Sequence, residues 1–201
     1  DNGDSQRCVL KYHHKMEGTF PLCQIHPDFF GAEPEIIPIV INDEGKRKEA
    51  YVNNSTRLIY GLRDLYSQIS EVSGAVFYIE KTAKPGEYRF RFDDEIDEQL
   101  SVDSGRSLEL LDLKGRYESS DIPIYDVMKE VLAKQGMAFA QLVNEINIVR
   151  RCSRLLVASI LSSYHTFHTR GKGISTPRRN PRGSTRPSAS ISRRTDLKVS
   201  S

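Results

Sequence analysis

Long apolar runs are missing from this chain of 201 residues. The longest runs, such as Ile36 to Ile41, fall far short of the roughly 20 residues that a helix needs to cross a bilayer. No stretch resembles a signal peptide. We therefore expect no membrane contact and no secretion, and we expect the protein in the cytoplasm, on the nucleoid, or in the nucleus.

Cysteine is also scarce. The three cysteines, Cys8, Cys23 and Cys152, make an odd number and lie in distant parts of the chain. This spread argues against a disulfide framework and favours a reducing compartment.

Motifs of catalysis are absent as well. The chain has no Gly-x-Ser-x-Gly, no phosphate-binding Gly-x4-Gly-Lys-Ser/Thr and no dinucleotide fingerprint. Asp112-Leu-Lys114 has the local form of a nuclease strand, but the acid that could complete it, Asp28, is separated from it by far more chain than such sites usually span. We predict that the protein is not an enzyme and needs no cofactor.

The composition is ordinary for a globular protein, with 38% hydrophobic and 28% charged residues. This balance predicts a hydrophobic core. The charge is distributed unevenly. From His168 onward there are nine Lys or Arg residues and one acid, which leaves 20 basic and 26 acidic residues before that point. A body with a charge near −6 therefore carries a C-terminal part near +8, and this part dominates the electrostatics.

The first two-thirds of the chain favours strands. Residues 1–33 show no clear period and are expected to form an irregular lead-in. Residues 34–114 are predicted to form a mixed, β-rich domain with one main helix. Its expected elements are a hairpin at 35–41 and 49–52, a helix at 54–69, and a second hairpin at 74–79 and 88–92.

Two segments after the second hairpin are less regular. The carboxylate run 93–98 is most simply a solvated loop, although it could also screen the basic tail. Residues 108–113 fit a short helix or a strand equally well. The polar stretch Lys114–Asp121 contains Gly115 and is the predicted domain boundary.

Three helical stripes follow this boundary. They consist of Ile124, Val127, Met128, Val131 and Leu132; of Phe139, Leu142, Val143 and Ile146; and of Leu156, Val157, Ile160, Leu161 and Tyr164. Because each stripe can bury the others, residues 121–175 are predicted to form a compact three-helix domain.

This domain ends in a basic segment that contains Phe167, Arg170, Gly171, Lys172 and Gly173. The order of three helices and a glycine-bearing basic hairpin resembles the winged helix-turn-helix family, particularly its HARE-type versions. The resemblance covers about 55 residues. It implies that the third helix enters the major groove of DNA and that the hairpin, or wing, contacts the backbone.

The candidate nucleic-acid-binding residues follow from this resemblance and from the spacing of cations. They are Arg150, Arg151, Arg154, Ser162, His165, Arg170, Lys172, Arg178 and Arg179. Few of these side chains suit the reading of base edges, so the third helix is expected to grip the backbone more than to read a sequence.

Residues 176–201 are rich in Pro, Ser, Arg and Gly and are predicted to form a disordered basic tail. Its cations could bind phosphates by releasing counterions. A localisation signal or a solubilising end is an equally good interpretation.

The β-rich domain loosely resembles the B3-type β-barrel DNA-binding domains, through strands 35–41 and 74–79 around a helix. Its acidic surface suits DNA only if Lys46, Arg47, Lys48, Arg57 and Arg63 gather on one side. A structural or dimerising domain is the alternative.

Zinc offers one other possibility. Cys8, His13, Cys23 and His26 supply half-sites that are chemically able to hold the ion. The outer spacing matches no known zinc pattern, so incidental Cys and His residues are the better interpretation.

The sequence therefore predicts an α+β protein without catalytic activity that binds nucleic acid, DNA in preference to RNA, with a role in transcription regulation or a related process. Two alternatives remain. One is an interaction adaptor with a protein partner, or a homodimer; the other is the DNA-recognition subunit of a restriction or defence system.

Overall fold

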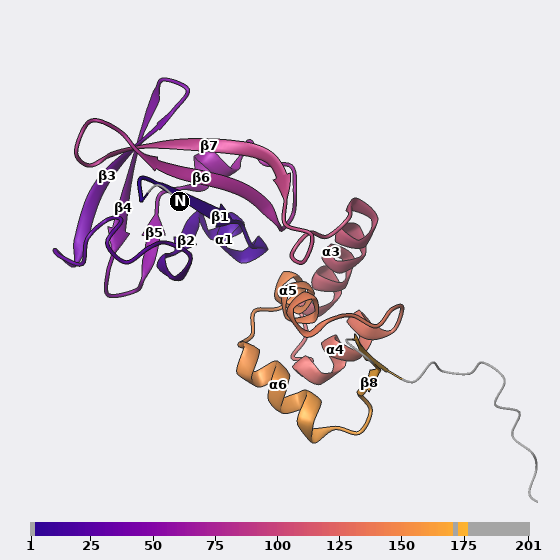
Figure 1. Cartoon of the computed structure of the whole chain (residues 1–201). Coiled ribbons are helices and arrows are strands. Elements are labelled where there is room, and N and C mark those ends of the chain that lie inside the picture. Colours follow the sequence, from indigo (N-terminus) through magenta and orange to yellow (C-terminus); the bar gives the residue numbers. More distant parts are fainter. Residues whose placement is uncertain (1–2, 171–172, 177–201) are drawn as a thin grey trace, which may run out of the picture.

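The computed structural model describes residues 3–170 and 173–176. It is a mixed α+β structure, as the sequence predicted, with a curled sheet followed by a group of helices (Figure 1). We call residues 3–96 the sheet lobe and the described residues from 104 onward the helical lobe. Within these described residues, no helix is long and apolar enough to cross a membrane.

The sheet lobe contains seven strands in the order β1-β6-β7-β3-β4-β5-β2. All neighbours are antiparallel except β3 and β7. The sheet curls into an open half-barrel with β1 and β2 at its edges (Figure 1). The strands are β1 (Ser5–Val9), β2 (Thr19–Pro21), β3 (Ile36–Asp43), β4 (Lys46–Asn53), β5 (Leu58–Tyr60), β6 (Ala75–Lys81) and β7 (Glu87–Ile96).

Both predicted hairpins are confirmed. β3 and β4 pair from Ile36↔Asn53 to Asp43↔Lys46, and the turn is closed by Asn42 Oδ1, which accepts the amide of Gly45 at 2.9 Å. β6 and β7 pair around the predicted Lys84-Pro-Gly86 turn. β7 continues through Ile96, so the carboxylate run 93–98 begins as strand and not as a loop.

The expectation of an irregular lead-in at 1–33 was wrong for its first two-thirds. β1, α1 (Tyr12–Glu17), β2 and the 3-10 turn η1 (Leu22–Gln24) occupy this segment. Cys8 and Phe20 are completely buried in the core of the sheet. The individual elements are too short to show a period in sequence, and their order comes from partners far away, such as β6 for β1.

The predicted helix at 54–69 was also wrong. This segment forms β5 and a single turn of helix, α2 (Arg63–Tyr66). Gly61 separates them with φ 90°, and a Cβ at this position would lie 3.1 Å from the carbonyl oxygen of Glu49. This left-handed residue, packed against β4, interrupts the helical spacing of the leucines around it.

The helical lobe has its own buried apolar cluster, separate from that of the sheet lobe. It begins with α3 (Ser104–Glu118), which settles the undecided segment 108–113 as helix. Leu110 and Leu113 of α3 are buried in the second cluster. The predicted boundary at Lys114 therefore falls inside a continuous helix that packs with the residues after it.

The three predicted helices are confirmed as α4 (Ile124–Leu132), α5 (Phe139–Val149) and α6 (Arg154–Ser163). A hairpin of β8 (His168–Arg170) and β9 (Gly173–Ser175) follows α6. Ile174 and Met137 exchange two backbone hydrogen bonds of 2.9 and 2.7 Å, which fasten the hairpin to the segment between α4 and α5. Of the predicted disordered tail, residues 177–201 lie outside the described residues.

Candidate nucleic-acid interface

Helix α6 presents one face to solvent. Val157 is fully buried against the second cluster, and Leu155, Ser159 and Ser162 lie on the opposite side of the helix, at spacings of four and three residues. We call Arg154, Leu155, Ser159, Ser162 and Ser163 the α6 face. All five are exposed.

The helix is anchored where it begins. Ser153 caps it, because its hydroxyl oxygen accepts the amide of Leu156 at 3.1 Å. Neither α6 nor the link that precedes it, from Arg150 onward, contains an acidic residue. The amino-terminal end of the helix dipole is also positive, so this end of α6 favours anions.

Arg154 lies at that end. Its guanidinium carbon is 5.3 Å from the centroid of the Phe139 ring, a cation-π contact that orients the side chain while leaving it exposed. The structure therefore places this predicted residue where it can meet a ligand of α6.

The serine hydroxyls of α6 are partly occupied. Ser162 donates to the carbonyl of Ala158 at 2.9 Å, and Ser163 donates to that of Ser159 at 2.8 Å. Each hydroxyl proton is used, and the oxygen retains a lone pair. A ligand therefore meets Ser162 as an acceptor. His165 is exposed just beyond the helix.

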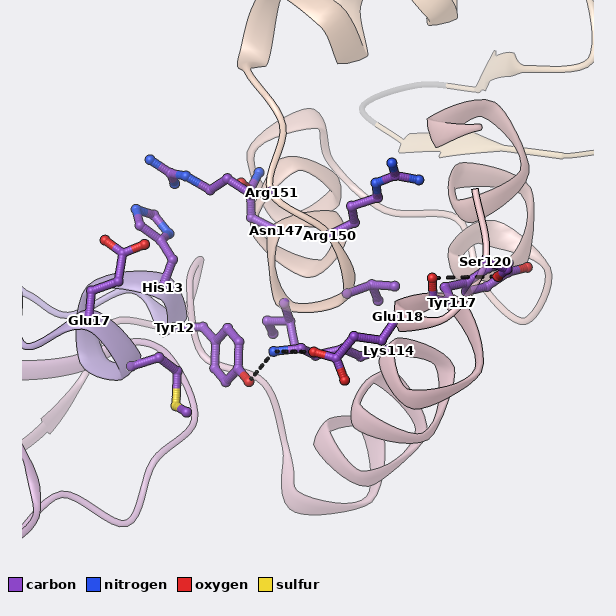
Figure 2. Close-up of a pocket in the computed structure, with 13 residues that line it drawn as sticks. Tyr12, His13, Glu17, Lys114, Tyr117, Glu118, Ser120, Asn147, Arg150 and Arg151 are labelled. Carbon is purple, nitrogen blue, oxygen red and sulfur yellow. Dashed lines mark hydrogen bonds and ion pairs between the residues drawn. The ribbon is translucent and has the colours of Figure 1, made fainter. Parts of the chain in front are cut away.

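Arg151 does not lie on α6, contrary to the sequence-based prediction, whereas Arg150 precedes the helix as predicted. Both precede the helix, and their side chains lead in opposite directions (Figure 2). Arg150 donates to the carbonyl of Ile122 and lies 3.7 Å from a carboxylate oxygen of Asp121. Its contacts connect the end of α5 to the start of α4.

Arg151 instead faces the sheet lobe. It lines a cavity of about 370 Å³ between α1 and the helical lobe, together with Tyr12, His13 and Lys114 (Figure 2). The Lys114 ammonium donates to the Tyr12 hydroxyl at 3.1 Å and lies 4.0 Å from a Glu118 carboxylate oxygen. The cavity therefore lies between the lobes, away from the α6 face, and is lined by both polar and apolar side chains.

Both histidines of α1 are kept neutral. Burial lowers the pKa of His13 to about 3, and the charges of His14 and Arg151 act in the same direction. Burial likewise lowers the pKa of His14 to about 4. His14 accordingly acts as a hydrogen-bonding core residue, with Nδ1 2.8 Å from the Thr19 hydroxyl.

The wing residues are described only in part. The backbone of Arg170 belongs to β8, whereas Lys172, Arg178 and Arg179 lie outside the described residues. Phe167 is buried against Tyr125, with ring centroids 5.6 Å apart in an edge-to-face arrangement. This contact fixes the start of the hairpin on α4.

The zinc candidates are not brought together. In residues 3–170 and 173–176, no three His, Cys, Asp or Glu side chains cluster in a way that could hold a metal ion. Cys8 is completely buried, and burial raises the pKa of its thiol, which disfavours the thiolate that zinc requires. Cys23 and His26 are exposed, and His26 lies beside Asp28.

Several cations of the sheet lobe form ion pairs with acids. Arg91 lies 3.1 Å from both Glu80 and Asp93, and Arg7 pairs with Glu95. Of the five cations that the B3-type resemblance required, Arg47 lies 3.4 Å from Glu87 and Lys48 lies 3.2 Å from Asp64. Two of the five cations are therefore already paired with acids of the same lobe.

Sequence reasoning missed the exposure of Leu155 on the α6 face. The Leu155 side chain is 82% exposed. Leu156 and Tyr164, which the predicted stripe assigned to the core, are 43% and 47% exposed. The available signal was the position of Leu155, directly opposite Val157 in the helical period. Comparison with known proteins adds nothing to this geometry, since no family model, curated protein or solved structure matches the chain.

Proposed function

We propose that this protein binds double-stranded DNA without catalysing a reaction, and that the described residues from α4 to β9 act as a winged helix. The order of the elements supports this proposal: α4 is followed by α5, α6 and the β8–β9 hairpin. The backbone hydrogen bonds between Met137, which lies between α4 and α5, and Ile174 of β9 support it as well. In this arrangement α6 enters the major groove and the β8–β9 hairpin lies along the backbone.

The observation that carries the proposal is the α6 face. The face is exposed, contains no acid and begins at Arg154, which Phe139 holds in place, and helix α6 itself lies away from the sheet lobe (Figure 1). A phosphate backbone is the polyanion that such a surface suits. The excess of cations from His168 onward adds an attraction that does not depend on sequence.

The test is a titration of labelled duplex DNA with the full chain at several salt concentrations. We expect affinity to fall steeply with salt, and we expect the double substitution of Arg170 and Lys172 by Ala to reduce the salt slope by about one to two. Arg154→Ala should weaken binding by roughly tenfold to 150-fold, the effect of losing one charge-assisted hydrogen bond.

Arg89→Ala is the matched control, because this exposed cation lies on β7 beside Glu80 and far from α6 in the chain. It should leave affinity and slope unchanged. Absence of binding by the folded protein at low salt would overturn the proposal, and so would equal losses of affinity in Arg89→Ala and Arg154→Ala.

A second function, that of an interaction adaptor, is favoured by one specific observation. The exposed Leu155, Leu156 and Tyr164 all lie on α6 or directly after it. Leu155 and Leu156 are adjacent in α6, and exposed apolar patches are typical of surfaces that contact other proteins. The adaptor proposal is supported if the folded chain fails to bind duplex DNA at low salt.

A further inference from the structure

The cavity between the lobes has the size and the place of a ligand site. Its volume is about 370 Å³, and three parts of the chain line it: α1 of the sheet lobe, the end of α3, and the end of α5 with the link to α6 (Figure 2). Cavities of about 300–1,000 Å³ hold small molecules, and they occur preferentially where domains meet.

One of the three cations that line this cavity is available to a ligand. Lys114 lies 4.0 Å from Glu118, and Arg150 lies 3.7 Å from Asp121. Arg151 lines the cavity as well and forms no ion pair within residues 3–170 and 173–176. Its guanidinium is therefore the cation that can meet an anion here.

His13 extends toward the same side of the cavity as Arg151 (Figure 2). Burial lowers the pKa of His13, and the positive charges of His14, Arg151 and Lys11 act in the same direction. Each of these charges favours an anion beside the ring. The neutral imidazole can still donate one N–H to such a ligand.

Apolar surface lies in the same cavity. Met16 is 53% exposed there, and the rings of Tyr12 and Tyr117 also line it. A methionine side chain is flexible and adapts to the shape of an apolar partner. The cavity therefore suits a ligand that joins an anionic group to an apolar or aromatic part.

We propose that this cavity binds a small organic anion, with its carboxylate or phosphate group between Arg151 and His13. The apolar part of the ligand lies against Met16 and the two tyrosine rings. A guanidinium offers parallel N–H donors that match either anionic group. The site uses no residue of the α6 face or of the β8–β9 hairpin, so it stands apart from the proposed DNA binding.

The experiment titrates the full chain with two matched pairs of probes and follows the backbone amide resonances by NMR. The pairs are adenosine monophosphate with adenosine, and phenylacetate with phenylacetamide; only the first member of each carries the anionic group. We expect one of the anions to shift the resonances of residues 12–17 and 147–151 until they saturate. Its neutral partner should bind roughly tenfold more weakly or less.

Three variants test the arrangement of charge. Arg151→Ala should weaken binding of the anion by roughly tenfold to 150-fold. Arg116→Ala, which alters an exposed arginine of α3 that does not line the cavity, should leave binding unchanged. Glu17→Gln removes an acid from the wall of the cavity and should strengthen binding up to about fivefold. Because all three side chains are exposed, the variants should fold.

The outcomes separate the possible ligands. Saturable binding of adenosine monophosphate or of phenylacetate that Arg151→Ala alone weakens supports the proposal, and the probe that binds identifies phosphate or carboxylate as the group. Binding of neither anion overturns the proposal, as do equal affinities within each pair of probes or equal effects of Arg151→Ala and Arg116→Ala. Weaker binding by Glu17→Gln would point to a cationic ligand and would overturn it as well.

Discussion

Arg106 of α3 and Glu145 of α5 form a buried ion pair. The Arg106 Nη2 and Nε atoms lie 2.7 and 2.9 Å from the same Glu145 carboxylate oxygen, and the two side chains are 10% and 1% exposed. Arg106 Nη2 also donates to the carbonyl of Val131, at the end of α4, at 2.7 Å. One guanidinium thus connects α3, α4 and α5.

Removal of one partner of this ion pair should lower the free energy of unfolding. Arg106→Met leaves the Glu145 carboxylate buried without its cation, and we expect the free energy of unfolding to fall by about 3–5 kcal/mol. Urea denaturation measures the change. Arg116→Ala removes an exposed arginine that pairs with Asp112 on α3 and should cost less than about 1 kcal/mol. Equal destabilisation in the two variants would contradict this prediction.

The stability of the sheet lobe should depend on pH through His14. Its folded pKa is about 4, below the ordinary value of 6.5, so protons bind to the unfolded chain first as the pH falls. Stability contributed by His14 is therefore complete above about pH 6.5 and is lost as the pH falls toward 4. Its size is on the order of 3 kcal/mol.

The measurement is urea denaturation at several pH values for the wild-type protein and for His14→Gln. The glutamine can still bond to the Thr19 hydroxyl but does not titrate. We expect the variant to lose stability less steeply between pH 6.5 and 4, with His13 providing the slope that remains. Identical slopes would show that His14 does not carry the effect.

Asn144 should couple the two lobes. From α5 it donates to the carbonyl of Leu100 at 2.9 Å and accepts the hydroxyl of Ser73 at 3.1 Å, and both Asn144 and Ser73 are buried. Asn144→Ala leaves these groups without a partner and should cost about 1–3 kcal/mol. A double-mutant cycle with Ser73→Ala should give a coupling of about 0.5 kcal/mol or more. Strict additivity would argue against the connection.

Gly136 should be required for the attachment of the β8–β9 hairpin. A Cβ at this position would lie 3.0 Å from the Ile174 carbonyl oxygen, which accepts the Met137 amide. We expect Gly136→Ala to destabilise the helical lobe by about 1 kcal/mol, with faster hydrogen exchange at Met137.

Gly115 offers the matched control for that substitution. It lies inside α3, where a Cβ would meet nothing within 4 Å. Gly115→Ala should stabilise the chain by about 0.5–1 kcal/mol, because alanine favours a helix interior. Thermal denaturation of the two variants should therefore shift in opposite directions, and a shared direction would count against the packing explanation for Gly136.

The sequence alone determined those elements whose partners are close in the chain. The hairpins around Gly45 and Pro85 and the helices α4, α5 and α6 follow from period, turn residues and glycine, all of which act over a few residues. The concentration of positive charge after His168 is likewise a property of the sequence, and no packing alters it.

Tertiary structure decided everything that depends on distant partners. It gave β1 its place beside β6, made strand of β5 despite a helical spacing of leucines, and joined α3 to the helical lobe through Arg106. It also turned Arg150 and Arg151 away from α6 and left Leu155 in solvent. Burial and pairing across the chain set these outcomes, because their free energies exceed the weak local preferences that a sequence pattern records.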